Sequence, residues 1–191
     1  MIDLSFKNNK LPKGGALLIS DPFLDEAYFR RSVILLCEHG EDASFGLVLN
    51  NFLEVDLQEL DNDFPDINAR ISVGGPVETH SLYYIHSFTD IEESFEVRTG
   101  LFFGGSFSQL KHLVEEEPSN ISKIRFFLGY SGWDKGQLRN EIAEHSWIVV
   151  DNISNDEILA TVDDNFWQHC LEKQGKEFRT ISRFPLNPNN N

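Results

Sequence analysis

Runs of apolar residues, separated by glycine and polar residues, predict a chain made mostly of strands. The run at 33–36 is continuously apolar instead of alternating. It therefore predicts a strand that is covered on both faces, in the middle of a sheet. Residues 32–38 and 45–50 are separated by the polar segment 40–44, which predicts a hairpin with a moderately long loop. Further strands are expected at 16–20, 71–73, 82–86, 95–98, 101–103, 123–128 and 147–151.

One helix has a clear start signal. Ser106 and Gln109 fit a capping box, with Ser106 as the N-cap and the Gln109 side chain reaching back to it. The apolar residues that follow share one helical face, and Pro118 ends the helix. Other helices are expected at 136–144 and at 165–173, the latter with Asp164 as its cap, and residues 56–60 can form at most a short helix. Strand, glycine-rich loop, helix and strand between 123 and 151 match a crossover unit, which predicts a partly parallel sheet.

The length of 191 residues fits one well-filled core. We expect a polar N-terminal arm at 1–14, a single domain at 15–185 and a disordered tail at 186–191. No internal repeat is visible.

The formal net charge of −15 bears on possible partners. Nucleic acids and anionic membrane surfaces are bound through cations, so direct binding to either is disfavoured. The sequence shows no apolar run long enough for a membrane span and no signal peptide, which predicts a cytoplasmic protein. Basic residues near both ends could form a local patch if the termini meet: Lys7, Lys10, Lys13, Lys173, Lys176, Arg179 and Arg183.

The segment 129–138 concentrates three glycines and two large aromatic residues between a predicted strand and a predicted helix. Its first four residues resemble the start of a nucleophile elbow centred on Ser131, but Trp133 stands where that motif has its last glycine. The structural interpretation is favoured: the glycines allow a tight loop, and the aromatic side chains lock it to the core.

Gln137 and Glu141 lie four residues apart on the predicted helix, on one face beside Trp133. An aromatic side chain with a polar pair in a glycine-lined concavity is the best candidate pocket for a small molecule or peptide. The structural alternative is that Gln137 and Glu141 satisfy backbone groups of the glycine loop. The candidate binding residues are Tyr130, Ser131, Trp133, Gln137, Glu141, Gly74 and Gly75, although Gly74 and Gly75 also fit a simple turn.

Other candidate chemistry is weaker. Cys37 and His39 could pair as nucleophile and base, but burial of the cysteine would disfavour its thiolate. Cys37 and Cys170 are expected as buried, reduced thiols, with a disulfide between them as the alternative. The histidines lack the spacing of a zinc site, so no metal is expected. The turn before Ser106 could hold a phosphate, but a tight turn into a capped helix is the favoured interpretation.

Several motifs together resemble the YqgE/AlgH family of small bacterial proteins. They are Leu17-Leu18-Ile19-Ser20-Asp21-Pro22, Ser32-Val33-Ile34-Leu35-Leu36-Cys37-Glu38-His39, Gly46-Leu47-Val48-Leu49-Asn50, Gly74-Gly75-Pro76-Val77 and Gly129 to Leu138. The likeness runs from Gly15 to Leu171, and Ser131 replaces a common alanine. The resemblance implies an α+β fold, a single domain whose bent, forked mixed sheet curls into a pseudo-barrel with helices packed around it. It supplies no catalytic residue, metal or cofactor, and the biochemical function of the family is unsettled.

Relatives in this family are often labelled transcriptional regulators. The chain shows no helix-turn-helix with a basic second helix. The leading hypothesis is therefore a non-enzymatic regulatory or adaptor protein that binds a protein partner or a small ligand. The alternatives are a hydrolase or transferase at the 129–137 segment, using Ser131 or a phosphate held at Ser106, and a direct DNA-binding regulator.

Overall fold

The longest strand, β9 (Ile124–Asp134), is the axis of the structure, because three other strands pair along its length. The computed structural model describes residues 10–69, 71–160 and 165–183. The other strands are β1 (Leu17–Ser20), β2 (Val33–His39), β3 (Ala43–Val48), β4 (Phe52–Leu53), β5 (Ile71–Val73), β6 (Val77–His86), β7 (Phe95–Arg98), β8 (Leu101–Phe103) and β10 (Trp147–Val150). The helices are α1 (Leu57–Leu60), α2 (Phe107–Glu116), the 3₁₀ helix η1 (Pro118–Lys123), α3 (Gln137–Ala143), α4 (Asn155–Leu159), α5 (Phe166–Glu172) and α6 (Lys176–Ile181).

The sheet forks at β9. Its main path runs β10-β1-β2-β3-β9-β6-β8-β7, and β5 and β4 branch from β9. The first half of β9 pairs with β5 and β6, and its last four residues pair with β3. The pairing of β5 with β9 is parallel, and the neighbours on the main path are antiparallel. Within the described residues β10 and β7 end the path without pairing to each other. The sheet is therefore open, and the expected pseudo-barrel is not confirmed.

The segment that the sequence predicts as a loop is a strand. Residues 129–134 continue β9 without a break, and α3 begins only at Gln137. Gly129 adopts a φ of +68° inside the strand, a backbone conformation that glycine reaches without steric cost. The crossover prediction also needs correction, since β1, β2 and β3 separate β10 from β9. The parallel pairing in the sheet is instead that of β5 with β9.

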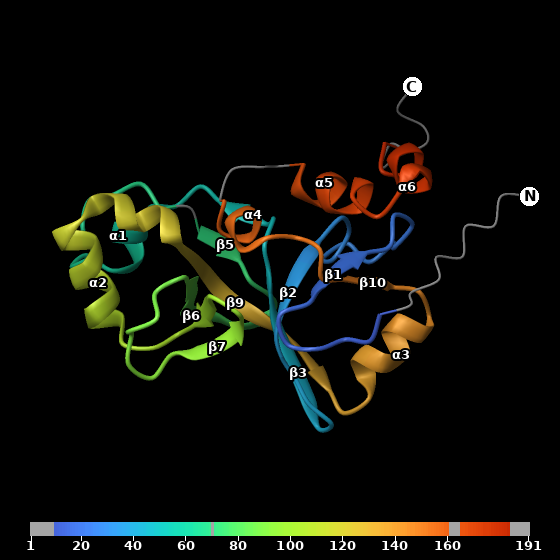
Figure 1. The fold of residues 1–191 in the computed structure, drawn as a ribbon, viewed down its shortest axis with the longest axis horizontal. Helices are drawn as coiled ribbons and strands as arrows, with labels where there is room; N and C mark the ends of the chain where they lie inside the picture. The colour runs from blue at the N-terminus through green and yellow to red at the C-terminus, as the bar shows by residue number, and fades with distance from the viewer. Residues whose placement is uncertain (1–9, 70, 161–164, 184–191) are drawn as a thin grey trace, which may run out of the picture.

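Strand β2 is central, as the continuous apolar run predicts, and the hairpin of β2 with β3 is confirmed. Residues 33–36 have no exposed surface. Val33 and Leu35 pack in the cluster that contains residues of α4, α5 and α6, whereas Ile34 and Leu36 pack with Trp147 and α3. Figure 1 shows α5 and α3 on opposite sides of these strands. A strand covered on both faces needs apolar side chains at every position, which explains the pattern.

Helix α2 begins where its cap predicts, although one half of the expected box is absent. The Ser106 hydroxyl accepts a hydrogen bond from the Gln109 backbone N–H. The Gln109 side chain does not reach back, and it accepts instead from the backbone N–H of Glu92 at 2.9 Å. The Ser106 N–H donates to the Glu92 carbonyl, so the chain before α2 satisfies the group that the box would have served. The helix ends at Glu116, before Pro118.

Three expectations lie outside the described residues: the cap at Asp164, the contribution of Lys7 to a basic patch, and the tail at 186–191. No helix in the described part of the chain is long and apolar enough to cross a membrane.

Candidate functional site

The end of β9 presents alternate residues to two different environments, as strand geometry requires. Ser131 and Trp133 are buried, with exposed fractions of 1% and 5%. Gly132 and Asp134 are exposed and lie on the opposite face. Gly132 is directly opposite Phe45 in the register of β3 with β9, so the Phe45 ring lies on the exposed face.

This exposed face forms one wall of a cleft of about 850 Å³. The cleft lies between the β2–β3 hairpin with the end of β9, on one side, and β6 with β8, on the other. Its volume falls in the range of small-molecule and peptide sites. The lining residues are Glu38, Gly40, Glu41, Asp42, Ala43, Ser44, Phe45, Val77, Tyr83, Phe103, Tyr130, Gly132, Trp133, Asp134 and Gln137.

Five aromatic rings from five strands pack together at this cleft; we call them the aromatic cluster. Four of the rings line the cleft, and the Phe95 ring lies against two of those four. Its members are Phe45, Tyr83, Phe95, Phe103 and Tyr130. The Phe45 ring lies 5.3 Å from that of Phe103 and 6.0 Å from that of Tyr130. Tyr83 stacks on Phe103 at 5.9 Å and meets the edge of Tyr130 at 5.7 Å. The Phe95 ring lies 5.2 Å from the Phe103 ring, and Phe95 is 40% exposed.

The aromatic cluster is partly buried from below and open from above. Four of its rings pack against the main hydrophobic core while retaining exposed surface. Large aromatic side chains left exposed in one contiguous group are unusual on a soluble protein and indicate an interaction surface.

Carboxylates line one side of the opening. Glu38, Glu41, Asp42 and Asp134 line it, and they come from the hairpin and the end of β9. Among the described residues, the ion pair that reaches this rim joins Lys135 Nζ to Asp42 Oδ1 at 2.9 Å, and both side chains are largely exposed. Exposed pairs of this kind contribute little stability and exchange partners readily. The rim therefore carries a local excess of negative charge.

A tyrosine hydroxyl couples the aromatic cluster to a further carboxylate. The Tyr83 hydroxyl donates a hydrogen bond to Glu78 Oε2. Burial, followed by this hydrogen bond and the charge of Glu78, raises the pKa of Tyr83 to about 12. The hydroxyl accordingly stays protonated near neutral pH and remains a donor.

Trp133, Gln137 and Glu141 meet, but chiefly on the other side of β9. Glu141 Oε2 accepts hydrogen bonds from the indole N–H of Trp133 at 2.8 Å and from that of Trp147 at 2.7 Å. Gln137 donates to Glu141 Oε1 at 2.9 Å and accepts from the backbone N–H of Asp134 at 3.0 Å. This network fixes α3 to the sheet. Gln137 accepts from a backbone N–H, as the structural alternative predicts, whereas Glu141 accepts from side chains and not from the backbone groups that this alternative expected. Gln137 and Trp133 also contribute to the cleft lining, whereas Glu141 does not.

Ser131, Gly74 and Gly75 lie away from the cleft. The Ser131 hydroxyl is buried within a strand and donates to the Gly74 carbonyl at 3.2 Å. A Cβ on Gly75 would lie 2.0 Å from the carbonyl carbon of Tyr130, and one on Gly74 would lie 2.3 Å from the carbonyl oxygen of Gly129. The two glycines allow the link between β5 and β6 to cross β9 at this distance. These contacts support structural roles for all three residues.

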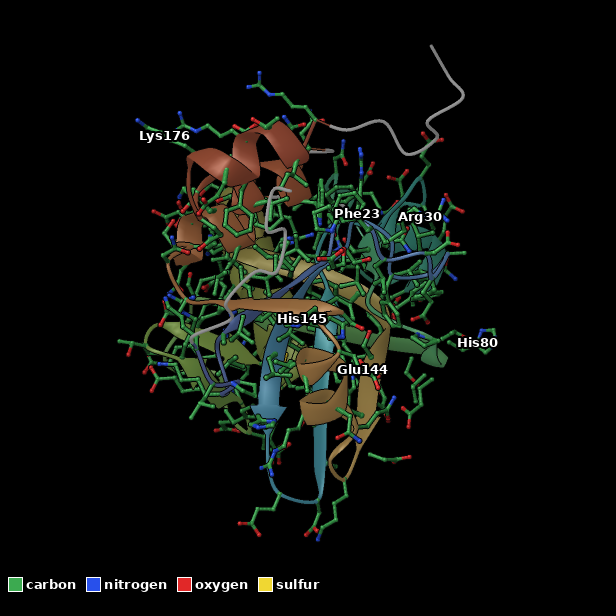
Figure 2. All side chains as sticks on the ribbon, turned by 90° about the vertical axis from the view of Figure 1, so that its right-hand side faces the viewer. Phe23, Arg30, His80, Glu144, His145 and Lys176 are labelled. Carbon is green, nitrogen blue, oxygen red and sulfur yellow. The ribbon has the colours of Figure 1, made fainter. Side chains whose placement is uncertain are left out.

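The remaining candidate groups are engaged separately. Cys37 and Cys170 are both buried free thiols, and burial raises the pKa of the Cys37 thiol. His39 Nδ1 bonds to the Ser44 hydroxyl at 2.7 Å. No group of three metal-ligating side chains occurs in the described ranges. Figure 2 shows His80 at the tip of β6, well apart from His145 beside α3.

The turn before Ser106 and three of the basic residues near the termini also make internal contacts. In the turn, the Gly104 N–H donates to the Tyr84 carbonyl at 3.0 Å and the Ser106 N–H to the Glu92 carbonyl at 2.8 Å, and the Ser106 hydroxyl caps α2. Three of the basic residues near the termini form ion pairs with separate carboxylates: Lys10 with Asp151, Lys173 with Glu157, and Arg183 with Glu172.

Tyr130 was predicted from the sequence as a binding residue, whereas the other members of the aromatic cluster were not. Phe45, Tyr83, Phe95 and Phe103 lie in segments that were correctly expected to be strands. Their sequence signal is that of ordinary core aromatics, because partial exposure depends on how the sheet forks. The nearest usable signal is the glycine at 132, since a glycine within a strand often marks the close approach of another group.

The fold and the cleft define an α+β protein built on an open, forked and mainly antiparallel sheet. A family model described as AlgH-like matches residues 17–179, and the chain belongs to this family. Proteins named UPF0301 protein are 38% identical over 184 residues in Parabacteroides distasonis and over 182 residues in Bacteroides thetaiotaomicron; each alignment covers 95% of this chain and 92% of the relative.

Solved structures share the fold. A crystal structure of a Corynebacterium diphtheriae protein superposes with a TM-score of 0.76 at 24% identity, covering 92% of this chain and 94% of the other. The solution structure of the AlgH protein from Pseudomonas aeruginosa has a TM-score of 0.71 at 21% identity, with 93% and 99% covered. The resemblance found in the sequence motifs is thus confirmed at the level of family and of the α+β fold.

Proposed function

We propose that this protein is a non-enzymatic adaptor or regulator that holds a segment of a partner protein in the cleft. The observation that carries this proposal is the aromatic cluster. Its rings are anchored in the core below and exposed above, which is the arrangement of a preformed recognition surface. Aromatic side chains contribute much contact area at a small entropic cost, and they dominate binding at protein interfaces.

The geometry around Ser131 weighs against the hydrolase alternative. Its hydroxyl faces the Gly74 carbonyl inside the sheet, and a nucleophile must face its substrate. A phosphate role for Ser106 is weakened in the same way, because its hydroxyl caps α2. The acidic rim and the net charge of −15 oppose direct binding to DNA. Regulation through a protein partner is compatible with the engaged serine hydroxyls and with the negative charge.

Photo-crosslinking in cells tests this proposal. Benzoylphenylalanine replaces Phe95, which is 40% exposed in the aromatic cluster, or Phe23, which is 54% exposed in the loop after β1. We expect irradiation to join a partner protein to position 95 and not to position 23, with the partner identified by mass spectrometry. Equal yields from both positions, or no adduct from position 95, would refute the cleft as the binding surface. An adduct between two copies of this chain would show self-association and overturn the adaptor role.

A further inference from the structure

The chemistry of the cleft specifies its occupant more closely, on the assumption that the proposed function is correct. We propose that the bound segment is cationic, with a lysine or arginine side chain lying against the rings of Tyr83 and Tyr130 and held between carboxylates of the rim.

The aromatic faces of the cleft favour a cation. A cation is attracted to the negative face of an aromatic ring when it approaches within about 6 Å of the ring centre. Tyr83 and Tyr130 meet edge to face at 5.7 Å, and Phe45 and Phe103 lie beside them. A long side chain that enters here meets ring surface from several strands, so its methylene groups also have apolar partners.

The carboxylates of the rim also favour a cationic segment. Glu38, Glu41 and Asp134 have no ion pair with another described residue, and Asp42 shares its charge with the exposed Lys135. A neutral segment that covered this opening would remove water from carboxylates without supplying a partner, which is costly. An anionic segment would meet direct repulsion. A cationic segment replaces the lost water with opposite charge, and the net charge of −15 attracts it from a distance.

Gly132 provides the space. It lies across from Phe45 on the cleft face, and a Cβ built on it would be 3.4 Å from Tyr130 Cε2 and 3.8 Å from Val77 Cγ2. The absence of a side chain leaves the wall beside the Tyr130 ring open. A cation can therefore lie over that ring without displacing a protein side chain.

The test uses two extended peptides on the full-length protein. The first is acetyl-Ala-Lys-Ala-Lys-Ala-amide, in which both lysines lie on one face of an extended chain. The second carries norleucine in place of each lysine, which keeps the length and removes the charge. Nuclear magnetic resonance titration of isotope-labelled protein gives the affinity and, from Gly132 and Asp134, the location. We expect the lysine peptide to bind at least about fivefold more tightly.

Matched charge variants separate the rim from the general acidity of the protein. Glu38→Gln with Asp134→Asn removes two charges from the rim, and Glu26→Gln with Glu144→Gln removes two exposed charges outside the lining. We expect the rim pair to weaken the lysine peptide about threefold or more and the remote pair to leave it nearly unchanged. Equal effects of the two pairs, or shifts spread over the acidic surface, would overturn the inference.

The two proposals fail in distinguishable ways. A norleucine peptide that binds at Gly132 as tightly as the lysine peptide overturns the cationic occupant, while an adduct from position 95 still supports the adaptor. Absence of that adduct refutes the proposed function itself.

Discussion

Replacing Gly75 by alanine is expected to lower the free energy of unfolding by about 3 kcal/mol or more, and failure to fold counts as the same result. The added Cβ would lie 2.0 Å from the carbonyl carbon of Tyr130 and 2.2 Å from the backbone nitrogen of Ser131. These are backbone atoms of the central strand, so no rotamer change relieves the overlap. Urea unfolding followed by circular dichroism measures the effect.

Gly132→Ala is the matched control for Gly75→Ala. Both glycines lie beside Tyr130, but a Cβ at position 132 meets its nearest neighbour at 3.4 Å. We expect the stability of this variant to be unchanged or raised by about 0.5 kcal/mol, since alanine suits a strand better than glycine. A Gly75→Ala variant as stable as the control would show that the link between β5 and β6 does not need its close crossing of β9.

The second large effect is expected at Glu141. Its carboxylate accepts the indole N–H groups of both Trp133 and Trp147, whose side chains are almost fully buried. Glu141→Ala leaves both donors without this acceptor, at about 1–3 kcal/mol for each group, so we expect a total loss near 3 kcal/mol. Glu141→Gln retains an oxygen that can accept both bonds and should cost about 1 kcal/mol.

The control for Glu141 lies on the same helix end. Glu144 is exposed, and its replacement by alanine should change the unfolding free energy by less than about 0.5 kcal/mol. Chemical denaturation of the three variants, with tryptophan emission as a second probe, measures the difference. Equal stability of Glu141→Ala and Glu144→Ala would contradict the role of Glu141 in fixing α3 to the sheet.

Local signals in the sequence predicted the elements that depend on local physics. The apolar run at 33–36 predicted a central strand because every position of this run is buried on one face of the sheet or the other. Ser106 predicted the start of α2 because an N-cap hydroxyl bonds to the next turn of its own helix. The partner of the Gln109 side chain could not be predicted in this way, because Glu92 comes from another part of the chain.

The 129–134 segment shows where local reasoning fails. Its glycines are typical of a loop, yet they serve a strand whose backbone is approached closely by another segment. The carbonyl oxygen of Gly75 lies 2.6 Å from a Cβ built on Gly129. Only the tertiary fold brings those residues together. Composition alone therefore predicted a loop where the structure has a strand.

The candidate site depends even more on the tertiary fold. Tyr130, Trp133 and Gln137 were predicted from one continuous segment, and all three contribute to the cleft lining. Binding by these residues stays a prediction. The other aromatic residues of the lining come from β3, β6 and β8, and the fork at β9 decides which of their side chains remain exposed. A pattern of apolar and polar positions does not carry that information.

The most direct test of the cleft as a binding surface is to fill it. Gly132→Leu places a side chain beside the Tyr130 ring, and Gly132→Ala adds a single carbon at the same backbone position. The yield of partner cross-linked from position 95 is measured in both backgrounds, after urea unfolding confirms that both fold. The binding account predicts that the leucine variant loses about nine-tenths of the adduct while the alanine variant keeps it. An unchanged yield in a folded leucine variant would contradict the account.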